Sequence, residues 1–204
     1  MNDRLDALLT DIKRLENEVR KELRERQRVF FYEVQDRVVH FTDDMKQLHR
    51  ERMQPVLRYL REARLRNLLT VPVIWMVLLP ALLMDLFVTV YMHTCFPVYG
   101  IPRVRRSDYL LIDRHYLGYL NVIEKLNCLY CSYFNGLIGY VREVAARTEQ
   151  YWCPIKHARQ NPAPHSRYGQ FFDYGDAEQY RARLQRLRTD FGDLKEKNGG
   201  DDKA

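Results

Sequence analysis

The stretch Leu68–Met92 reads LLTVPVIWMVLLPALLMDLFVTVYM and holds a single formal charge, Asp85. As a helix rising ~1.5 Å per residue, it would reach roughly 37 Å, enough to cross a hydrocarbon core of about 30 Å with some tilt. Apolar stretches longer than about 18 residues are uncommon outside membranes. The sequence therefore predicts a membrane segment over residues 68–96, with a buried core helix of a soluble domain as the alternative.

Two features complicate a single straight span. Pro80 lies mid-segment, where its ring and missing N–H bend or break a helix. Arginines flank the segment on both sides, so the positive-inside rule would place both ends in the cytoplasm. A tilted single span is the leading interpretation, and a re-entrant hairpin bent at Pro80 stays open. The flanking arginines are Arg58, Arg61, Arg64 and Arg66 before the segment and Arg103, Arg105, Arg106 and Arg114 after it.

The charge inside the apolar segment needs a partner. An ionised carboxylate is costly in an apolar environment, so Asp85 is expected to be paired, protonated or turned toward protein. His93 lies two turns later on roughly the same helix face and is the partner that the spacing indicates.

The net charge is a mild +6, from 33 Lys and Arg against 27 Asp and Glu. Basic residues beside a membrane segment suit anionic lipid head groups better than nucleic acid, and no nucleic-acid motif is present. The first twenty residues are polar and amphipathic, so no cleavable signal is expected and the apolar segment should stay as an anchor. The predicted location is the cell membrane, with the C-terminal part on the cytoplasmic side.

Residues 1–67 are highly charged and carry regularly spaced apolar residues. Steps of three and four, with one phase slip near Leu23, are typical of amphipathic helices and coiled coils. The sequence predicts helix over residues 2–66, kinked at Pro55, that packs on the rest of the chain, forms a homo-oligomer or binds a protein partner. The apolar positions are Leu5, Leu8, Ile12, Leu15, Val19, Phe30, Val34, Val38, Phe41, Met45 and Leu48.

The chain after the anchor is predicted to be a connector followed by a helical module. Prolines and a glycine oppose helix in the connector, residues 97–107. Ser107 is a plausible N-cap for a helix beginning at Asp108, which would open a module over residues 108–190. The tail, residues 191–204, is expected to be disordered.

Between Lys125 and Arg142 the module carries no formal charge, and the stretch is rich in tyrosine. It is short for a full span, so we expect it to pack against the anchor or to lie at the head groups. Asn135–Gly136 could end one helix and start another. A last polar helix is predicted over Ala177–Arg188.

The strongest candidate site combines Cys128-x-x-Cys131 with Cys153-Pro-x-x-His157. Three thiolates and one imidazole form a tetrahedral ligand set common for zinc, and the same groups suit iron or iron–sulfur centres. The sequence thus predicts a zinc or iron site on these four residues, with Glu124, one turn before Cys128, as a possible further ligand. A dithiol pair at Cys128 and Cys131, or inert buried thiols, are the alternatives.

Helix geometry limits how such a site can form. On one straight helix Cys131 and Cys153 would lie roughly 33 Å apart, too far to share an ion within one chain. Either Asn135–Gly136 reverses the chain, or two copies pair antiparallel about an axis near Arg142, or no site exists.

The sequence therefore predicts an all-α, membrane-anchored protein. The leading function is metal binding, structural or redox. The alternative is an oligomeric membrane adaptor without metal, and the third is thiol redox chemistry at Cys128 and Cys131. No nucleophile, base and orienting group can be named together, so a non-enzymatic role is favoured.

Overall fold

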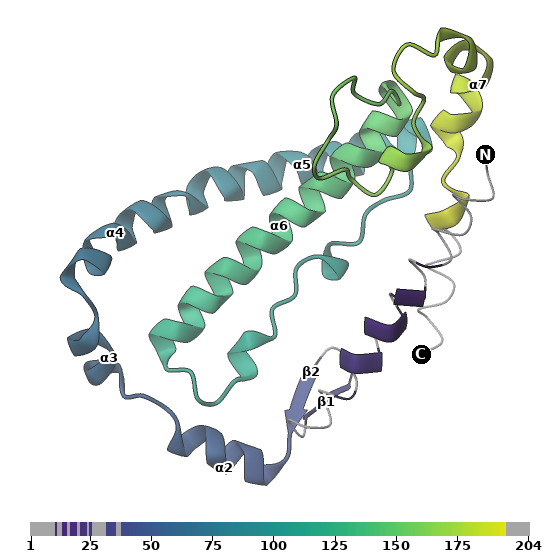
Figure 1. The fold of residues 1–204 in the computed structure, drawn as a ribbon. Helices are drawn as coiled ribbons and strands as arrows, with labels where there is room; N and C mark the ends of the chain where they lie inside the picture. Colours follow the sequence, from purple (N-terminus) through teal and green to yellow (C-terminus); the bar gives the residue numbers. More distant parts are fainter. Residues whose placement is uncertain are drawn as a thin grey trace. The chain divides into compact units, whose positions relative to one another are not determined.

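The computed structural model is mostly helical, which confirms the all-α class, and within the described residues one two-stranded hairpin departs from it (Figure 1). Its residues fall into two compact units. The first unit comprises Met1–Ala63 and Asp113–Leu129, and the second comprises Arg64–Ile112 and Tyr130–Ala204. The structure describes residues 11, 14–15, 17–19, 21–23, 25, 32–35 and 38–194.

The first unit contains a hairpin where the sequence predicted helix. Strand β1 (Tyr32–Gln35) pairs antiparallel with β2 (Val38–Phe41), with Tyr32 opposite Phe41. The prediction of helix over residues 2–66 is therefore wrong in this stretch. Because the stretch is dense in valine and aromatic residues, which pack well on a pleated surface, strand pairing outweighs its helical spacing.

The two helices that follow the hairpin are short. α2 (Asp43–Glu51) and α3 (Val56–Glu62) are separated at Pro55, as the sequence predicted. The described residues between 11 and 25 are helical, and the rest of the predicted heptad pattern before residue 32 lies outside the described residues. The coiled coil therefore stays a prediction.

His49 of α2 is one of the buried residues of the first unit. Its ring meets the edges of Phe41, at 4.8 Å between centroids, and Tyr119, at 5.1 Å. A Cβ at Gly118 would lie 3.1 Å from the His49 Cβ, so the segment before the long helix passes very close to α2.

The apolar stretch belongs to the second unit and forms two helices in line, α4 (Leu65–Met76) and α5 (Leu78–Tyr99). Together Arg66–Tyr99 amount to 34 residues of helix long and apolar enough to cross a membrane. The chain does not reverse, so the re-entrant hairpin at Pro80 is wrong. Pro80 acts only locally, because its ring opposes the Met76 carbonyl and the helix is interrupted at Val77.

Helix α6 (Val122–Trp152) runs unbroken for 31 residues. It begins later than predicted, because residues 108–121 hold only the short turns η1 (Arg106–Asp108) and η2 (Arg114–Tyr116). Its N-cap is Asn121, whose side chain accepts hydrogen bonds from the Ile123 and Glu124 N–H groups, rather than Ser107. The predicted break at Asn135–Gly136 is also wrong.

Gly136 has a packing role. A Cβ on it would lie 2.6 Å from the Tyr109 carbonyl oxygen and 2.9 Å from the Leu110 Cα. In the structure the connector continues past residue 107 through Leu110, and its backbone lies directly on α6 at this turn, where only glycine leaves room for it.

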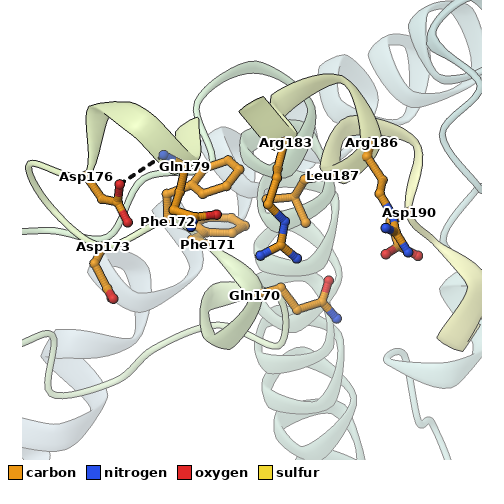
Figure 2. Close-up of a pocket in the computed structure, with 10 residues that line it drawn as sticks. All are labelled: Gln170, Phe171, Phe172, Asp173, Asp176, Gln179, Arg183, Arg186, Leu187 and Asp190. Carbon is orange, nitrogen blue, oxygen red and sulfur yellow. Dashed lines mark hydrogen bonds between the residues drawn. The ribbon is translucent and has the colours of Figure 1, made fainter. Parts of the chain in front are cut away.

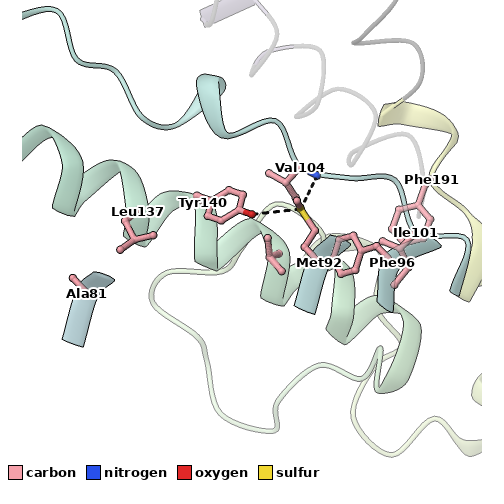
Figure 3. Close-up of a cluster of buried hydrophobic side chains, with 9 residues drawn as sticks. Ala81, Met92, Phe96, Ile101, Val104, Leu137, Tyr140 and Phe191 are labelled. Atoms are coloured by element: carbon pink, nitrogen blue, oxygen red, sulfur yellow. Dashed lines mark hydrogen bonds between the residues drawn. The ribbon is translucent and has the colours of Figure 1, made fainter. Parts of the chain in front are cut away.

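The core of the second unit lies between α5, the connector and α6 (Figure 3). α5 and α6 run side by side in the same direction, since contacts join Asp85 to Tyr133 and Tyr99 to Tyr151. The Met92 thioether accepts a hydrogen bond from the Val104 N–H at 3.3 Å. The buried cluster comprises Ala81, Met92, Phe96, Ile101, Val104, Leu137, Tyr140, Val144 and Phe191.

After α6, the chain forms a polar-rich module that ends the second unit. An isolated parallel bridge joins Ile155 to Phe172. The turn η3 (Tyr168–Gln170) and helix α7 (Ala177–Thr189) follow, and the prediction of a last helix from Ala177 is confirmed. The Asp176 side chain caps α7 by accepting a hydrogen bond from the Gln179 N–H.

Candidate functional site

The most distinctive polar group of the second unit is an ion pair on the apolar helix α5. The Arg106 guanidinium makes a two-pronged contact with the Asp85 carboxylate, at 2.6 and 2.8 Å. Tyr133 of α6 donates to the same carboxylate at 2.8 Å, and Thr89 donates to it at 3.2 Å. This set, the Asp85 cluster, joins α5, the connector and α6 through one buried carboxylate.

The Asp85 cluster surrounds one carboxylate with a guanidinium and two hydroxyl donors. The Asp85 side chain is 11% exposed and the Arg106 side chain is 40% exposed, and the guanidinium also lies over the Tyr140 ring. Burial raises the pKa of Tyr133 to about 12, and the hydrogen bond to Asp85 is the second cause of this rise. Tyr133 therefore keeps its proton at neutral pH and remains a donor.

The predicted Asp85–His93 pair is wrong. The His93 Nδ1 lies 2.8 Å from the Thr89 carbonyl oxygen, one turn earlier on the same helix. Asp85 pairs instead with an arginine 21 residues away, because the connector folds back along α5.

The four predicted metal ligands lie at widely separated places. Cys128 and Cys131 lie on α6, Cys153 follows its last turn, and His157 lies in the loop beyond. Because α6 is unbroken, about 33 Å of helix separates Cys131 from Cys153. Among the residues that the structure describes, no three His, Cys, Asp or Glu side chains could hold a metal ion together. A site within one chain would require rearrangement, whereas a shared site between copies stays a prediction.

None of the cysteines is buried, which argues against thiols that only fill a core. Cys131 and Cys153 are exposed, and Cys95 and Cys128 are partly exposed. A bond between Cys128 and Cys131 is geometrically poor, since Cβ atoms three residues apart on a helix lie about 5–6 Å apart. A disulfide needs about 3.5–4.5 Å, so it would distort α6.

Pairing of two α6 helices about Arg142 meets an obstacle. The Arg142 guanidinium donates to the carbonyl oxygens of Ala163 and Pro164, at 2.7 and 2.6 Å. The loop that contains Ala163 and Pro164 therefore lies against α6 at Arg142, where the twofold axis of a dimer would pass. A second copy would have to displace this loop or pair elsewhere.

Glu124 has a local role in place of the predicted ligand role. Its carboxylate accepts a hydrogen bond from the Asn121 N–H at 2.9 Å, and the Asn121 side chain accepts from the Glu124 N–H at 3.0 Å. This reciprocal arrangement is a capping box, which occupies the first free N–H groups of α6.

A second arginine network fixes the C-terminal module. Arg167 is 2% exposed and donates to the side chains of Gln150, Gln170 and Asp193. It also donates to the Asp190 carbonyl oxygen at 3.1 Å. Because a buried guanidinium is costly unless its donors are paired, this network is a strong structural constraint.

A small cavity of about 260 Å³ lies beside α7 in the same module (Figure 2). Arginine and aspartate side chains surround it, and two of the aspartates already have partners, since Asp173 pairs with Lys156 and Asp176 caps α7. Its walls are Gln170, Phe171, Phe172, Asp173, Asp176, Gln179, Arg183, Arg186, Leu187 and Asp190. The mixed charges select neither a cation nor an anion.

Comparisons with models of protein families, with curated proteins and with solved structures found no match for this chain.

Proposed function

We propose that this protein is a membrane-anchored helical scaffold, in which α4 and α5 cross the bilayer and carry the second unit with them. The observation that carries the proposal is the exposure of the apolar helix, most of which the rest of the described chain does not cover. In its most apolar window of 18 residues only 11% is buried within the chain. Leaving this much apolar helix in water would be very unfavourable, since apolar burial yields about 25 cal/mol per Å².

The rest of the second unit is consistent with this role. α5 buries one face, through Ala81, Met92 and Phe96, and leaves its opposite face apolar and bare. The Asp85 cluster neutralises the only formal charge on the apolar stretch, as a carboxylate near lipid requires. The exposed apolar side chains include Leu69, Val73, Met76, Leu79, Leu83, Leu86, Phe87 and Val90.

Replacing bare leucines with aspartate tests the membrane assignment. On an insertion scale each Leu→Asp change costs about 3–4 kcal/mol at the centre of a span, so Leu79→Asp with Leu83→Asp should abolish membrane insertion. The wild-type chain should stay in the membrane pellet after carbonate washing, and the double variant should be released or degraded.

Leu57→Asp is the matched control, because Leu57 is 82% exposed and lies on α3, before the apolar stretch. This variant should fractionate as the wild type does. A wild-type chain that stays in the supernatant without detergent would contradict the proposed anchor, as would a double variant that pellets unchanged.

Metal binding between copies is the second candidate, favoured by the exposure of Cys131 and Cys153. Detergent-purified protein should then contain about one zinc or iron per chain, and Cys128→Ser with Cys131→Ser should remove it. Elemental analysis with an absorption spectrum measures both content and identity. Cys95→Ser should keep the metal. If wild type and double variant are both metal-free and have the same melting temperature, metal binding is excluded and the proposed function is that of a membrane scaffold without metal.

A further inference from the structure

The first unit contains a cavity of its own, of about 650 Å³, which lies within the usual range for small-molecule sites. It opens between β2, α2 and the segment that precedes α6. Most of its walls are apolar, and its charged residues are two arginines and one aspartate. The walls are Val39, Phe41, Met45, Leu48, His49, Arg52, Asp113, Arg114, Leu117 and Tyr119.

A smaller cavity of about 310 Å³ adjoins the first one. The two share Val39, Phe41 and His49 as walls. The smaller cavity is basic where the larger is apolar, since His40, Lys46 and Arg50 also line it and no carboxylate does. Together they form an apolar chamber with a basic chamber beside it.

His49 lies at the boundary between the two chambers and is 8% exposed. Its ring packs against Phe41 and Tyr119 in T-shaped geometry. Because an imidazole can donate a hydrogen bond, a ligand head group placed beside His49 would gain a polar contact there.

The charges around the chambers favour an anion. Four basic side chains, Lys46, Arg50, Arg52 and Arg114, line the two cavities, against one carboxylate, Asp113. Lys46 contacts the exposed Asp43 at 2.9 Å, an ion pair that a competing anion can replace at little cost. The local excess of positive charge is therefore available to a ligand.

We propose that the first unit binds a long-chain fatty acid as its anion. The acyl chain occupies the apolar chamber, and the carboxylate lies in the basic chamber near His49, Lys46 and Arg50. One apolar and one basic chamber match one chain and one head group. The proposal is independent of the membrane assignment, because every residue that carries it belongs to the first unit.

Photolabelling of the full chain in phosphatidylcholine nanodiscs tests this binding. The probe is a palmitic acid with a diazirine near the end of its chain, and labelled peptides are mapped by mass spectrometry. Labelling of peptides that contain residues 39–52 and 113–119 should saturate and be displaced by excess oleate. Labelling of Leu68–Met92, which lipid-dissolved probe also reaches, should rise linearly and resist displacement.

Two comparisons test the predicted positions of head group and chain. The methyl ester of the probe should label the cavity peptides about tenfold less than the acid, because it lacks the charge that the basic chamber binds. Lys46→Gln with Arg50→Gln should reduce labelling by the acid to that of the ester. Arg58→Gln with Arg61→Gln removes the same charge outside the cavities and should leave labelling unchanged. Leu117→Trp, which fills the apolar chamber, should abolish labelling by both.

Labelling confined to the apolar stretch would overturn the proposal even before any variant is made. Equal labelling by acid and ester, unchanged in the Lys46 and Arg50 variant, would also overturn it, because apolar partitioning alone would then explain the signal. Far-UV circular dichroism of each variant confirms that lost labelling is not lost fold.

Discussion

Gly136→Val is expected to lower the melting temperature of the detergent-purified protein by about 10 °C. A Cβ at this position would lie 2.6 Å from the Tyr109 carbonyl oxygen and 2.9 Å from the Leu110 Cα. Both are backbone atoms, so the connector must move off α6. Overpacking of this kind costs about 3 kcal/mol, and each kcal/mol shifts the melting temperature by about 2–4 °C in a chain of this size.

Gly169→Ala is the matched control, since nothing lies within 4 Å of a Cβ built at Gly169. It should melt within about 1 °C of the wild type. If Gly136→Val melts like this control, the connector does not lie on α6 as described. Thermal melts followed by circular dichroism at 222 nm measure both variants.

Arg106→Met is expected to destabilise the second unit by about 3 kcal/mol. Methionine keeps the apolar stem but leaves the Asp85 carboxylate, 11% exposed, without its cation. Removing one partner of a buried pair typically costs about 3–5 kcal/mol. The lower end applies here, because the Arg106 side chain is 40% exposed and solvent already screens part of the attraction.

The control and the double variant separate charge pairing from packing. Arg105→Met removes an exposed neighbouring charge and should change stability by less than about 0.5 kcal/mol. Asp85→Leu combined with Arg106→Met should recover most of the loss, because an apolar pair leaves no unpaired charge. A double variant no better than Arg106→Met alone would mean that the guanidinium acts through packing. Denaturation midpoints in matched detergent measure all four proteins.

The sequence was most informative where one signal dominated. A stretch of twenty-five nearly uncharged residues is expected to be helical, because a helix satisfies its backbone hydrogen bonds within the segment. The described apolar stretch is helical throughout except at Val77. The polar α7 was also predictable from its flanking Pro- and Gly-rich loop and its Asp176 cap.

Local spacing failed where distant partners decide the conformation. Residues 32–41 fit both a heptad and an alternating strand pattern, and pairing of β1 with β2 selects the strand. Ser107 resembles an N-cap, but the helix begins later, where Asn121 and Glu124 form a complete capping box. The usual S/T-x-x-E/Q pattern does not detect this box, because its first residue is asparagine.

The Asp85 cluster could be predicted only in part. That Asp85 needs a partner follows from its place in an apolar segment. Arg106 is the partner because the connector folds back along α5. Such a long-range contact cannot be predicted from the spacing of residues along the sequence. The arginines after the anchor had been assigned to lipid contact, and Tyr133 carried no signal beyond membership of an aromatic stretch. A glycine inside a helix, Gly136, was the available hint of a close backbone approach.

The sparse packing of the first turns of α4 has a consequence for bilayers of different thickness. Residues 66–99 measure about 51 Å as helix, whereas a hydrocarbon core measures about 30 Å, so a spanning chain must tilt or extend beyond it. No described side chain of α4 is buried, and α6 holds α4 only near its end, where Tyr130 donates to the Ile74 carbonyl oxygen and contacts the Trp75 ring. In a bilayer, the turns of α4 before Ile74 can therefore change their tilt while the rest of the apolar helix stays on α6, so that hydrophobic mismatch is absorbed at one end.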